Sequence, residues 1–275
     1  NETVRLRDIA RSLPRGECGV SMVTVKRLND EKTLKVARVA NPDPMQFTHD
    51  RPGETFQILS AGVGYLKLSS IRIQDLDGYF ERASDTRGLI IDIRNYPSEF
   101  VVFALGSRLV QEPTPFVRFT IGDLGNPGAF SWTQPIALQP GGSDYKGVVV
   151  ILVDEVSISQ AEYTAMALRA GPRAVVVGST TAGADGNLST FALPGGLRTS
   201  MSGIGVFYPD KTATQQVGIV PDIELSPTLV GIREGRDEVL EAAVRYILGS
   251  GTNTDSIPGH DNLKGLLPGN SIPAQ

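Results

Sequence analysis

The segment of greatest chemical interest is 154–159, a polar stretch that contains Ser157 and Ser159. Ser159 is expected at the first turn of a helix, where free backbone N–H groups and the helix dipole favour negative charge. The same N–H groups can hold the oxyanion of an acyl-transfer intermediate, which makes Ser159 a candidate nucleophile. Ser159 followed three residues later by Glu162 also fits a capping box, so spacing alone favours a structural cap. Ser157 is a second candidate that nothing local prefers.

Two further polar segments follow apolar runs. The loop 178–186 is rich in glycine but lacks the lysine of a phosphate-binding loop. It predicts either backbone contacts to a substrate, around Gly183 and Ala184, or a plain connection between strands. Asp92 and Arg94 end another buried strand and would point to the same face at period two. We interpret them as a structural ion pair in preference to a catalytic carboxylate.

The elements around these segments predict an α/β architecture. We expect strands at 57–59, 63–69, 89–94, 115–121, 148–153 and 174–178, and helices at 75–83, 100–110 and 237–248. A further helix is expected to follow the segment 154–159 and to stop at Gly171-Pro172. The run 148–153 is apolar throughout and rich in β-branched residues, as in a strand covered on both faces. Ligands of open α/β sheets collect at the carboxyl ends of strands, which is where 154–159 would lie.

Other segments predict smaller features. Ser98 is expected to cap the helix 100–110. The Gly/Pro-rich stretch 122–142, which carries Trp132, is expected to be a long loop that acts as a lid or binding surface. The stretches 189–193 and 197–208 predict an antiparallel hairpin. Near the N-terminus, the sequence predicts a helix at 3–13 and a hairpin of strands 20–27 and 33–39. That is too little chain to form a core alone.

The composition excludes several classes of function. The chain has 275 residues, a net charge of −4 and no basic run, so nucleic acid is not an expected partner. No apolar run approaches the roughly 20 residues that cross a bilayer. Two histidines, His49 and His260, lie far apart in sequence, so neither a metal site nor a cofactor is expected. Cys18 is the single cysteine, which excludes an intramolecular disulfide.

Taken together, five segments resemble the C-terminal-processing (tail-specific) serine peptidase family, which includes the tricorn core. In chain order they are GLIIDIRNYPSEF, VVVILVDEVSISQAE, AVVVGSTTAGADG, GIVPDIELSPT and GRDEVLEAAVRYIL. The resemblance covers about residues 62–248 and implies a ClpP/crotonase-like α/β core of stacked strands and helices. The N-terminal segments VSMVTVKR and TLKVARV resemble the last part of the PDZ domain that precedes this core in the family.

The resemblance implies a division of the chain into four parts. These are a partial PDZ-like module at 1–42, a linker at 43–54, a peptidase-like core at 55–249 and a flexible tail at 250–275. The first half of the PDZ domain is missing, which suggests a truncated chain or an incomplete module.

The resemblance also assigns roles to individual residues. The family nucleophile falls on Ser159, and the oxyanion donors fall on the backbone N–H groups of Gln160 and Asn95. Gly183 and Ala184 fall at the substrate cleft, where an extended peptide would pair with a sheet edge. The sequence departs from the family in two places: the glycines after Asn95 are absent, and the position of the lysine general base is Ala184.

A serine nucleophile needs a base within hydrogen-bond reach, so the absence of the lysine leaves three accounts open. The base is a histidine on a segment upstream of this chain, as in the tricorn-type branch, which we favour. Alternatively it is a local group, Asp185 or His49. In the third account, the protein binds without cleaving.

The favoured function is a serine endopeptidase that acts through an acyl-enzyme on Ser159, with a peptide or protein as substrate. The alternative is a catalytically inactive member of the same fold that binds a peptide or a small apolar ligand. A crotonase-like acyl-CoA enzyme is a third hypothesis that rests on shared core topology alone. The resemblance implies an extracytoplasmic location, periplasmic or secreted, and is compatible with a homo-oligomer.

Overall fold

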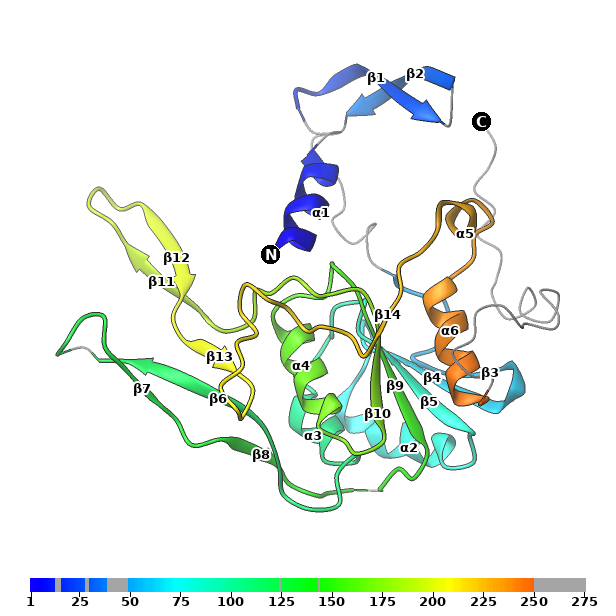
Figure 1. The fold of residues 1–275 in the computed structure, drawn as a ribbon, viewed down its shortest axis with the longest axis vertical. Helices are drawn as coiled ribbons and strands as arrows, with labels where there is room; N and C mark the ends of the chain where they lie inside the picture. The colour runs from blue at the N-terminus through cyan, green and yellow to red at the C-terminus, as the bar shows by residue number, and fades with distance from the viewer. Residues whose placement is uncertain (13–15, 28–29, 39–48, 124, 143, 250–275) are drawn as a thin grey trace.

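The structure, a computed structural model, describes residues 1–12, 16–27, 30–38, 49–123, 125–142 and 144–249. Its centre is a six-stranded sheet in the order β14-β10-β9-β5-β4-β3 (Figure 1). The strands are β3 (Phe56–Leu59), β4 (Val63–Lys67), β5 (Gly88–Asp92), β9 (Val148–Val153), β10 (Ala174–Gly178) and β14 (Ile223–Glu224). All pairs are parallel except β3 with β4, which is antiparallel. The expected α/β architecture is confirmed.

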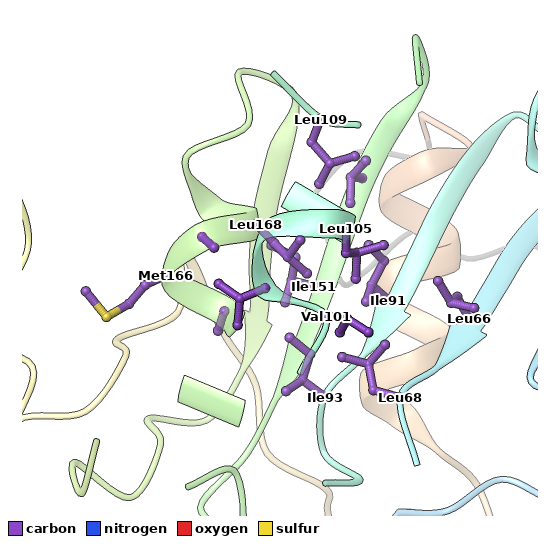
Figure 2. Packing of buried hydrophobic residues seen from close by; sticks show 14 of the residues in the cluster. Leu66, Leu68, Ile91, Ile93, Val101, Leu105, Leu109, Ile151, Met166 and Leu168 are labelled. Carbon is purple, nitrogen blue, oxygen red and sulfur yellow. The ribbon is translucent and has the colours of Figure 1, made fainter. Parts of the chain in front are cut away.

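Helices cover both faces of this sheet. They are α2 (Leu76–Ala83), α3 (Val102–Gly106), α4 (Gln160–Arg169) and α6 (Glu238–Ile247). The short helix α5 (Leu229–Arg233) precedes α6, and 3-10 turns lie at η2 (Ser60–Gly62) and η3 (Ile73–Asp75). Successive side chains of a strand point to opposite faces, so the apolar strand β9 supplies two cores. Val149, Ile151 and Val153 pack with residues of α2, α3 and α4 (Figure 2). Val150 and Leu152 pack with residues of α6.

A smaller sheet lies beside α3 and α4. It contains β6 (Thr114–Gly122), β7 (Phe130–Trp132), β8 (Ile136–Leu138) and β13 (Gly205–Phe207), with β6 paired to the other three. The expectation of one long loop over 122–142 is therefore wrong, because this stretch forms two short strands against β6. Trp132 packs edge-on against Phe207, with 4.7 Å between the ring centroids. The Arg118 guanidinium carbon lies 5.5 Å from the Trp132 ring centroid. The tryptophan is thus part of this sheet.

The predicted hairpin is present, but it ends earlier than expected. β11 (Leu188–Ala192) pairs with β12 (Arg198–Ser202), and every residue of both strands is exposed. This hairpin projects away from the core (Figure 1). The following residues leave it and join β6 as β13, so the single strand expected over 197–208 is two strands.

The N-terminal helix and hairpin are confirmed as α1 (Glu2–Ser12), β1 (Gly19–Arg27) and β2 (Asp30–Arg38). α1 contacts the core near the carboxyl ends of the strands (Figure 1). The Asn1 amide donates to the carbonyl oxygen of Thr181 at 2.8 Å, and Arg7 donates to the carbonyl oxygen of Glu155 at 2.8 Å. The relation of this segment to a PDZ domain stays a prediction.

Two expectations about helix α3 are wrong. The helix covers 102–106 instead of 100–110, and its N-cap residue is Val101, which makes no side-chain capping bond. The Ser98 hydroxyl instead donates to the carbonyl oxygen of Ile71 at 2.6 Å. It is therefore used to tie the chain after β5 to the chain after β4. Residues 43–48 of the expected linker and the expected tail 250–275 lie outside the described residues.

Candidate active site

Ser159 lies at the turn between β9 and α4 and directly precedes the first helical residue, Gln160. Its backbone angles are φ 56° and ψ −120°, a conformation that residues with a side chain rarely adopt. An ordinary N-cap has extended backbone angles, so Ser159 is not an ordinary cap. A strained serine between a strand and a helix is typical of a nucleophile elbow, and strain of this kind costs about 1–3 kcal/mol. The backbone therefore favours the nucleophile interpretation.

Glu162, on the first turn of α4, joins Ser159 to the glycine-rich loop. Its side chain is fully buried. Four groups donate to its carboxylate, namely the N–H groups of Ser159 (3.0 Å), Gly183 (2.6 Å) and Ala184 (3.0 Å) and the hydroxyl of Thr181 (2.5 Å). The half of the capping box in which Glu162 accepts from Ser159 is thus present. The same carboxylate thus holds the loop 181–184 against the turn.

Ser159 opens onto a cavity of about 390 Å³, which is within the range of roughly 300–1,000 Å³ for ligand pockets. The cavity lies between the turn, the loop after β10 and the smaller sheet. Its lining residues are Tyr96, Phe100, Phe119, Ser159, Gln160, Tyr163, Asp185, Gly186, Asn187, Ile204 and Val206. The Gln160 side chain donates to the carbonyl oxygen of Glu99 at 2.7 Å, which fixes the start of α4 against the loop after β5. The two proposed sources of oxyanion donors, Gln160 and the loop that begins at Asn95, are therefore neighbours.

Asp185 lines the same cavity, and its side chain is buried. Its Oδ1 accepts from the N–H of Gly186 at 2.7 Å, whereas Oδ2 is buried without a hydrogen-bond partner among the described residues. Burial raises the pKa of Asp185 to about 7; the Gly186 N–H opposes this rise and the negative charge of Glu162 adds to it. The group therefore titrates near neutral pH.

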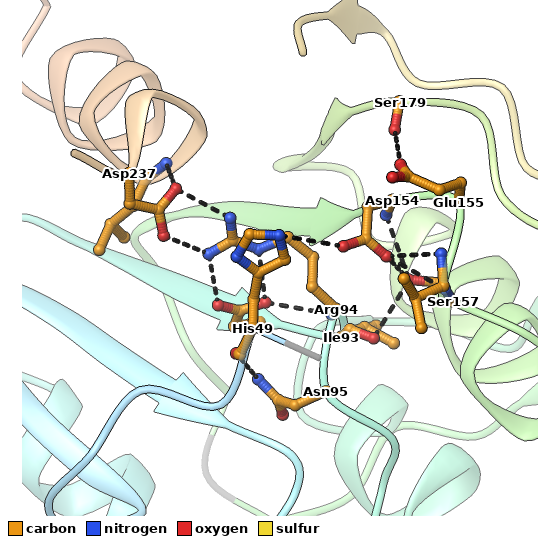
Figure 3. A network of polar contacts seen from close by, with 12 residues as sticks. His49, Ile93, Arg94, Asn95, Asp154, Glu155, Ser157, Ser179 and Asp237 are labelled. Carbon is orange, nitrogen blue, oxygen red and sulfur yellow. Dashed lines mark hydrogen bonds and ion pairs between the residues drawn. The ribbon is translucent and has the colours of Figure 1, made fainter. Parts of the chain in front are cut away.

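The polar residues at the end of β5 form a buried network (Figure 3). Arg94 binds Asp92 through Nε at 3.0 Å and Nη2 at 2.7 Å. It also binds Asp237, the N-cap of α6, through Nη1 at 2.8 Å and Nη2 at 2.7 Å. Burial would raise the pKa of Asp237, but Arg94 overcomes this effect and lowers it to about 2. Asp92 and Arg94 do not line the cavity. We read them, as predicted, as a structural ion pair, with Asp237 as its third member.

The side chain of Asn95 is also structural. Its Oδ1 accepts from the N–H groups of Leu68 and Ser69, both at 2.8 Å. Its Nδ2 donates to the carbonyl oxygen of His49 at 3.0 Å. These bonds hold the loop after β5 to the end of β4. The next residue, Tyr96, lines the cavity.

His49 and Ser157 belong to a different cluster, centred on Asp154 (Figure 3). His49 Nε2 lies 3.6 Å from Asp154 Oδ2, and Ser157 Oγ donates to the carbonyl oxygen of Ile93 at 3.2 Å. Burial raises the pKa of Asp154 to about 6, and His49 opposes the rise. Neither His49 nor Ser157 lines the cavity, so the structure does not bring them to Ser159 there.

The structure thus brings Ser159, Gln160 and Asp185 to one cavity, with Gly183 and Ala184 held to Ser159 through Glu162. Sequence reasoning missed two features of this site. One is that Glu162 also binds the glycine-rich loop; the capping-box spacing indicated only that it binds the start of the helix. The other is the aromatic wall of the cavity, whose residues come from separate segments with no common motif.

Among the described residues, no cluster of three or more histidine, cysteine, aspartate or glutamate side chains could hold a metal ion. In the same part of the chain, no helix combines the length and apolar character that spanning a bilayer requires.

Three comparisons show what the chain is similar to. It is 28% identical over 176 residues to carboxyl-terminal-processing peptidase 3, chloroplastic, of Arabidopsis thaliana, which covers 62% of this chain and 33% of that protein. It is 24% identical over 201 residues to a carboxyl-terminal-processing protease of a Synechocystis strain, over 70% of this chain and 43% of that protein. The chain thus spans less than half the length of either relative. A solved structure of a candidate peptidase from Parabacteroides merdae superposes with a TM-score of 0.64 at 25% identity, over 76% of this chain and 69% of that one.

The family comparison covers the elements that build the site. The model of peptidase family S41 matches residues 62–225, a range that includes β4, β5, β9, α4, β10 and every residue that lines the cavity. This is more than half of the chain, and the relatives named above carry the same activity in their names. The chain therefore belongs to peptidase family S41, a family of serine peptidases.

Proposed function

We propose that this protein is a serine endopeptidase that cleaves peptide bonds through an acyl-enzyme on Ser159. The observation that carries the proposal is the strained backbone of Ser159 at the mouth of the cavity, because the strain has no use in a simple helix cap. Ser159 Oγ attacks the substrate carbonyl and gives its proton to a base, which returns it to the leaving amine. Water then releases the acyl group.

The oxyanion donors in this proposal are the backbone N–H groups of Gln160 and Asn95. Gln160 N–H lies at the start of α4, where the helix dipole also favours the negative charge. The side-chain bonds of Gln160 and Asn95 support the assignment, because they hold the two segments in fixed positions before substrate binds. Gly183 and Ala184 form the adjacent part of the substrate cleft.

The general base is the open part of the mechanism. Ala184 has no titratable group, and His49 contacts Asp154. Asp185 lines the cavity, but its buried Oδ2 has no hydrogen-bond partner in the described part of the chain, so it does not bond Ser159 Oγ in this structure. We therefore keep the proposal that a histidine from a longer protein supplies the base. The share of its relatives that the chain covers, 33% and 43%, leaves room for it.

Active-site labelling of the full-length protein tests the proposal. We expect a fluorophosphonate probe to label the wild type but not Ser159→Ala. Ser157→Ala is the matched control, because Ser157 lies two residues away and its hydroxyl bonds the carbonyl oxygen of Ile93. Labelling that persists in Ser159→Ala and disappears in Ser157→Ala would move the nucleophile to Ser157. Absence of serine-dependent labelling would instead support the inactive, ligand-binding alternative, which Ala184 at the lysine position favours.

Peptide or protein substrates are the proposed partners. An extracytoplasmic location and a homo-oligomer stay proposals that rest on the family resemblance. Fractionation of the native cells and the molar mass of the full-length protein in solution test them.

A further inference from the structure

The two oxygens of the Asp185 carboxylate differ in their hydrogen bonds. Oδ1 has the N–H of Gly186 as a partner, but Oδ2 is buried with none among the described residues. A buried acceptor without a donor carries its full desolvation cost. Asp185 is 3% exposed and lines the cavity at Ser159, so the charge of its carboxylate acts on any ligand in this cavity.

Aromatic rings from three segments form much of the cavity wall. Tyr96 and Phe100 come from the loop after β5, Phe119 from β6 and Tyr163 from α4. Tyr163 stacks with Phe100 and with Phe119, with ring centroids 6.1 Å and 6.2 Å apart. Such rings form an apolar wall for the methylene stem of a long cationic side chain.

The ionisable side chains around the cavity are acidic, with no basic residue among the described residues that line it. The lining residues, all within the described chain, include no lysine, arginine or histidine. The negative charge of Glu162 acts on Asp185 and raises its pKa, and Asp185 in turn contributes to the raised pKa of Tyr163, for which burial is the larger cause. With a neutral guest, Asp185 can take up a proton near pH 7. A cationic guest would instead pair with its charged carboxylate.

We propose that the cavity is a subsite for a lysine or arginine side chain of the substrate, with Asp185 as the anionic partner and the four aromatic rings as walls. Because Ser159 lines the same cavity, the recognised residue is the one whose carbonyl Ser159 attacks. This inference rests on the proposed peptidase function. It assigns Asp185 to substrate recognition instead of proton abstraction.

The first test compares peptides that differ only in the residue before the scissile bond. Lysine and norleucine have the same chain length up to the charged group, so their ratio of kcat/KM isolates the charge. We expect the full-length wild type to prefer lysine on the order of tenfold to a hundredfold, as for a hydrogen bond to a charged group. In Asp185→Asn the ratio should fall to about one or below, because the amide carries no charge.

Two outcomes of this test overturn the inference. A wild type that prefers norleucine shows an apolar subsite, in which case the peptidase proposal stands and the cation subsite does not. Loss of cleavage of both peptides in Asp185→Asn, with the fold intact by circular dichroism, would make Asp185 the proton acceptor.

The second test needs no catalysis. In the Ser159→Ala background, n-butylammonium should raise the thermal midpoint in a concentration-dependent manner, whereas 1-butanol at the same concentrations should not. The shift should disappear in the double variant Ser159→Ala/Asp185→Asn. If butylammonium and butanol act alike, the cation site is wrong. If the shift is present but the wild type cleaves no peptide and is not labelled at Ser159, the peptidase proposal fails and the cation site stands.

Discussion

Replacement of Glu162 by glutamine tests whether this carboxylate holds the nucleophile turn and the glycine loop together. Each carboxylate oxygen accepts two hydrogen bonds: Oε1 from Thr181 and Gly183, and Oε2 from Ser159 and Ala184. Glutamine has nearly the same shape but keeps one acceptor oxygen. If its NH₂ group replaces Oε2, the N–H groups of Ser159 and Ala184 lose their acceptor; if it replaces Oε1, the N–H of Gly183 does, while the Thr181 hydroxyl can turn and accept from the amide.

The magnitude follows from the backbone donors that lose their acceptor, at least one in either orientation. A buried donor left without a partner costs about 1–3 kcal/mol, so we expect Glu162→Gln to lower the free energy of unfolding by about 1–3 kcal/mol. In a domain of this size, a loss at the upper end of this range, about 3 kcal/mol, lowers the thermal midpoint by roughly 6–12 °C. The measurement is urea and thermal unfolding at pH 7, followed by circular dichroism.

The matched control is Glu112→Gln, the same chemical change at an exposed position. It should alter the free energy of unfolding by no more than about 0.5 kcal/mol. A loss below about 1 kcal/mol in Glu162→Gln would refute the reasoning, because it would mean that the four donors are satisfied without the carboxylate.

Three further predictions concern stability. The folded-state pKa of Asp185 is about 7, above its ordinary 3.8, so wild-type stability should fall as pH rises from about 4 to 7. Asp185→Asn should remove that fall. Its free energy of unfolding, measured with urea at each pH, should exceed that of the wild type by up to about 4 kcal/mol at pH 8 but by little at pH 4. An equal dependence of the free energy of unfolding on pH in both proteins would contradict this prediction. Asp237→Asn keeps a capping oxygen but loses the ion pair with Arg94, and should cost about 2–4 kcal/mol at pH 7. Because the pKa of Asp237 is lowered to about 2, that cost should shrink as pH falls from 4 to 2; a cost independent of pH would count against the ion pair. Gly178→Ala would place a Cβ 1.9 Å from the carbonyl oxygen of Val153, at a residue whose φ is 135°. We therefore expect thermal unfolding to show a loss of more than about 3 kcal/mol in stability, or no folded protein. The control is Gly78→Ala, whose Cβ would meet nothing within 4 Å.

Local pattern predicted most elements of the central sheet. β9 was predicted with its observed bounds, because six successive apolar, β-branched-rich residues are consistent with burial on both faces. The wrong predictions concern segments whose structure depends on contacts with segments far away in the sequence. Residues 122–142 have few apolar residues and many glycines, and only pairing with β6 turns two parts of them into strands. Ser98 looked like a helix cap, but the chain after β4 uses its hydroxyl.

The sequence by itself determined the candidate nucleophile, because the strand, the polar turn and the helix around Ser159 are contiguous and their order carries the family resemblance. It also determined that Ala184 cannot act as a base. Only the tertiary structure decided how these parts act together. The left-handed backbone of Ser159, the four donors on Glu162 and the free carboxylate oxygen of Asp185 in an aromatic cavity depend on contacts between segments far apart in sequence. Such contacts leave no periodic trace in the chain, since each segment satisfies its own local pattern whether or not the others are in place.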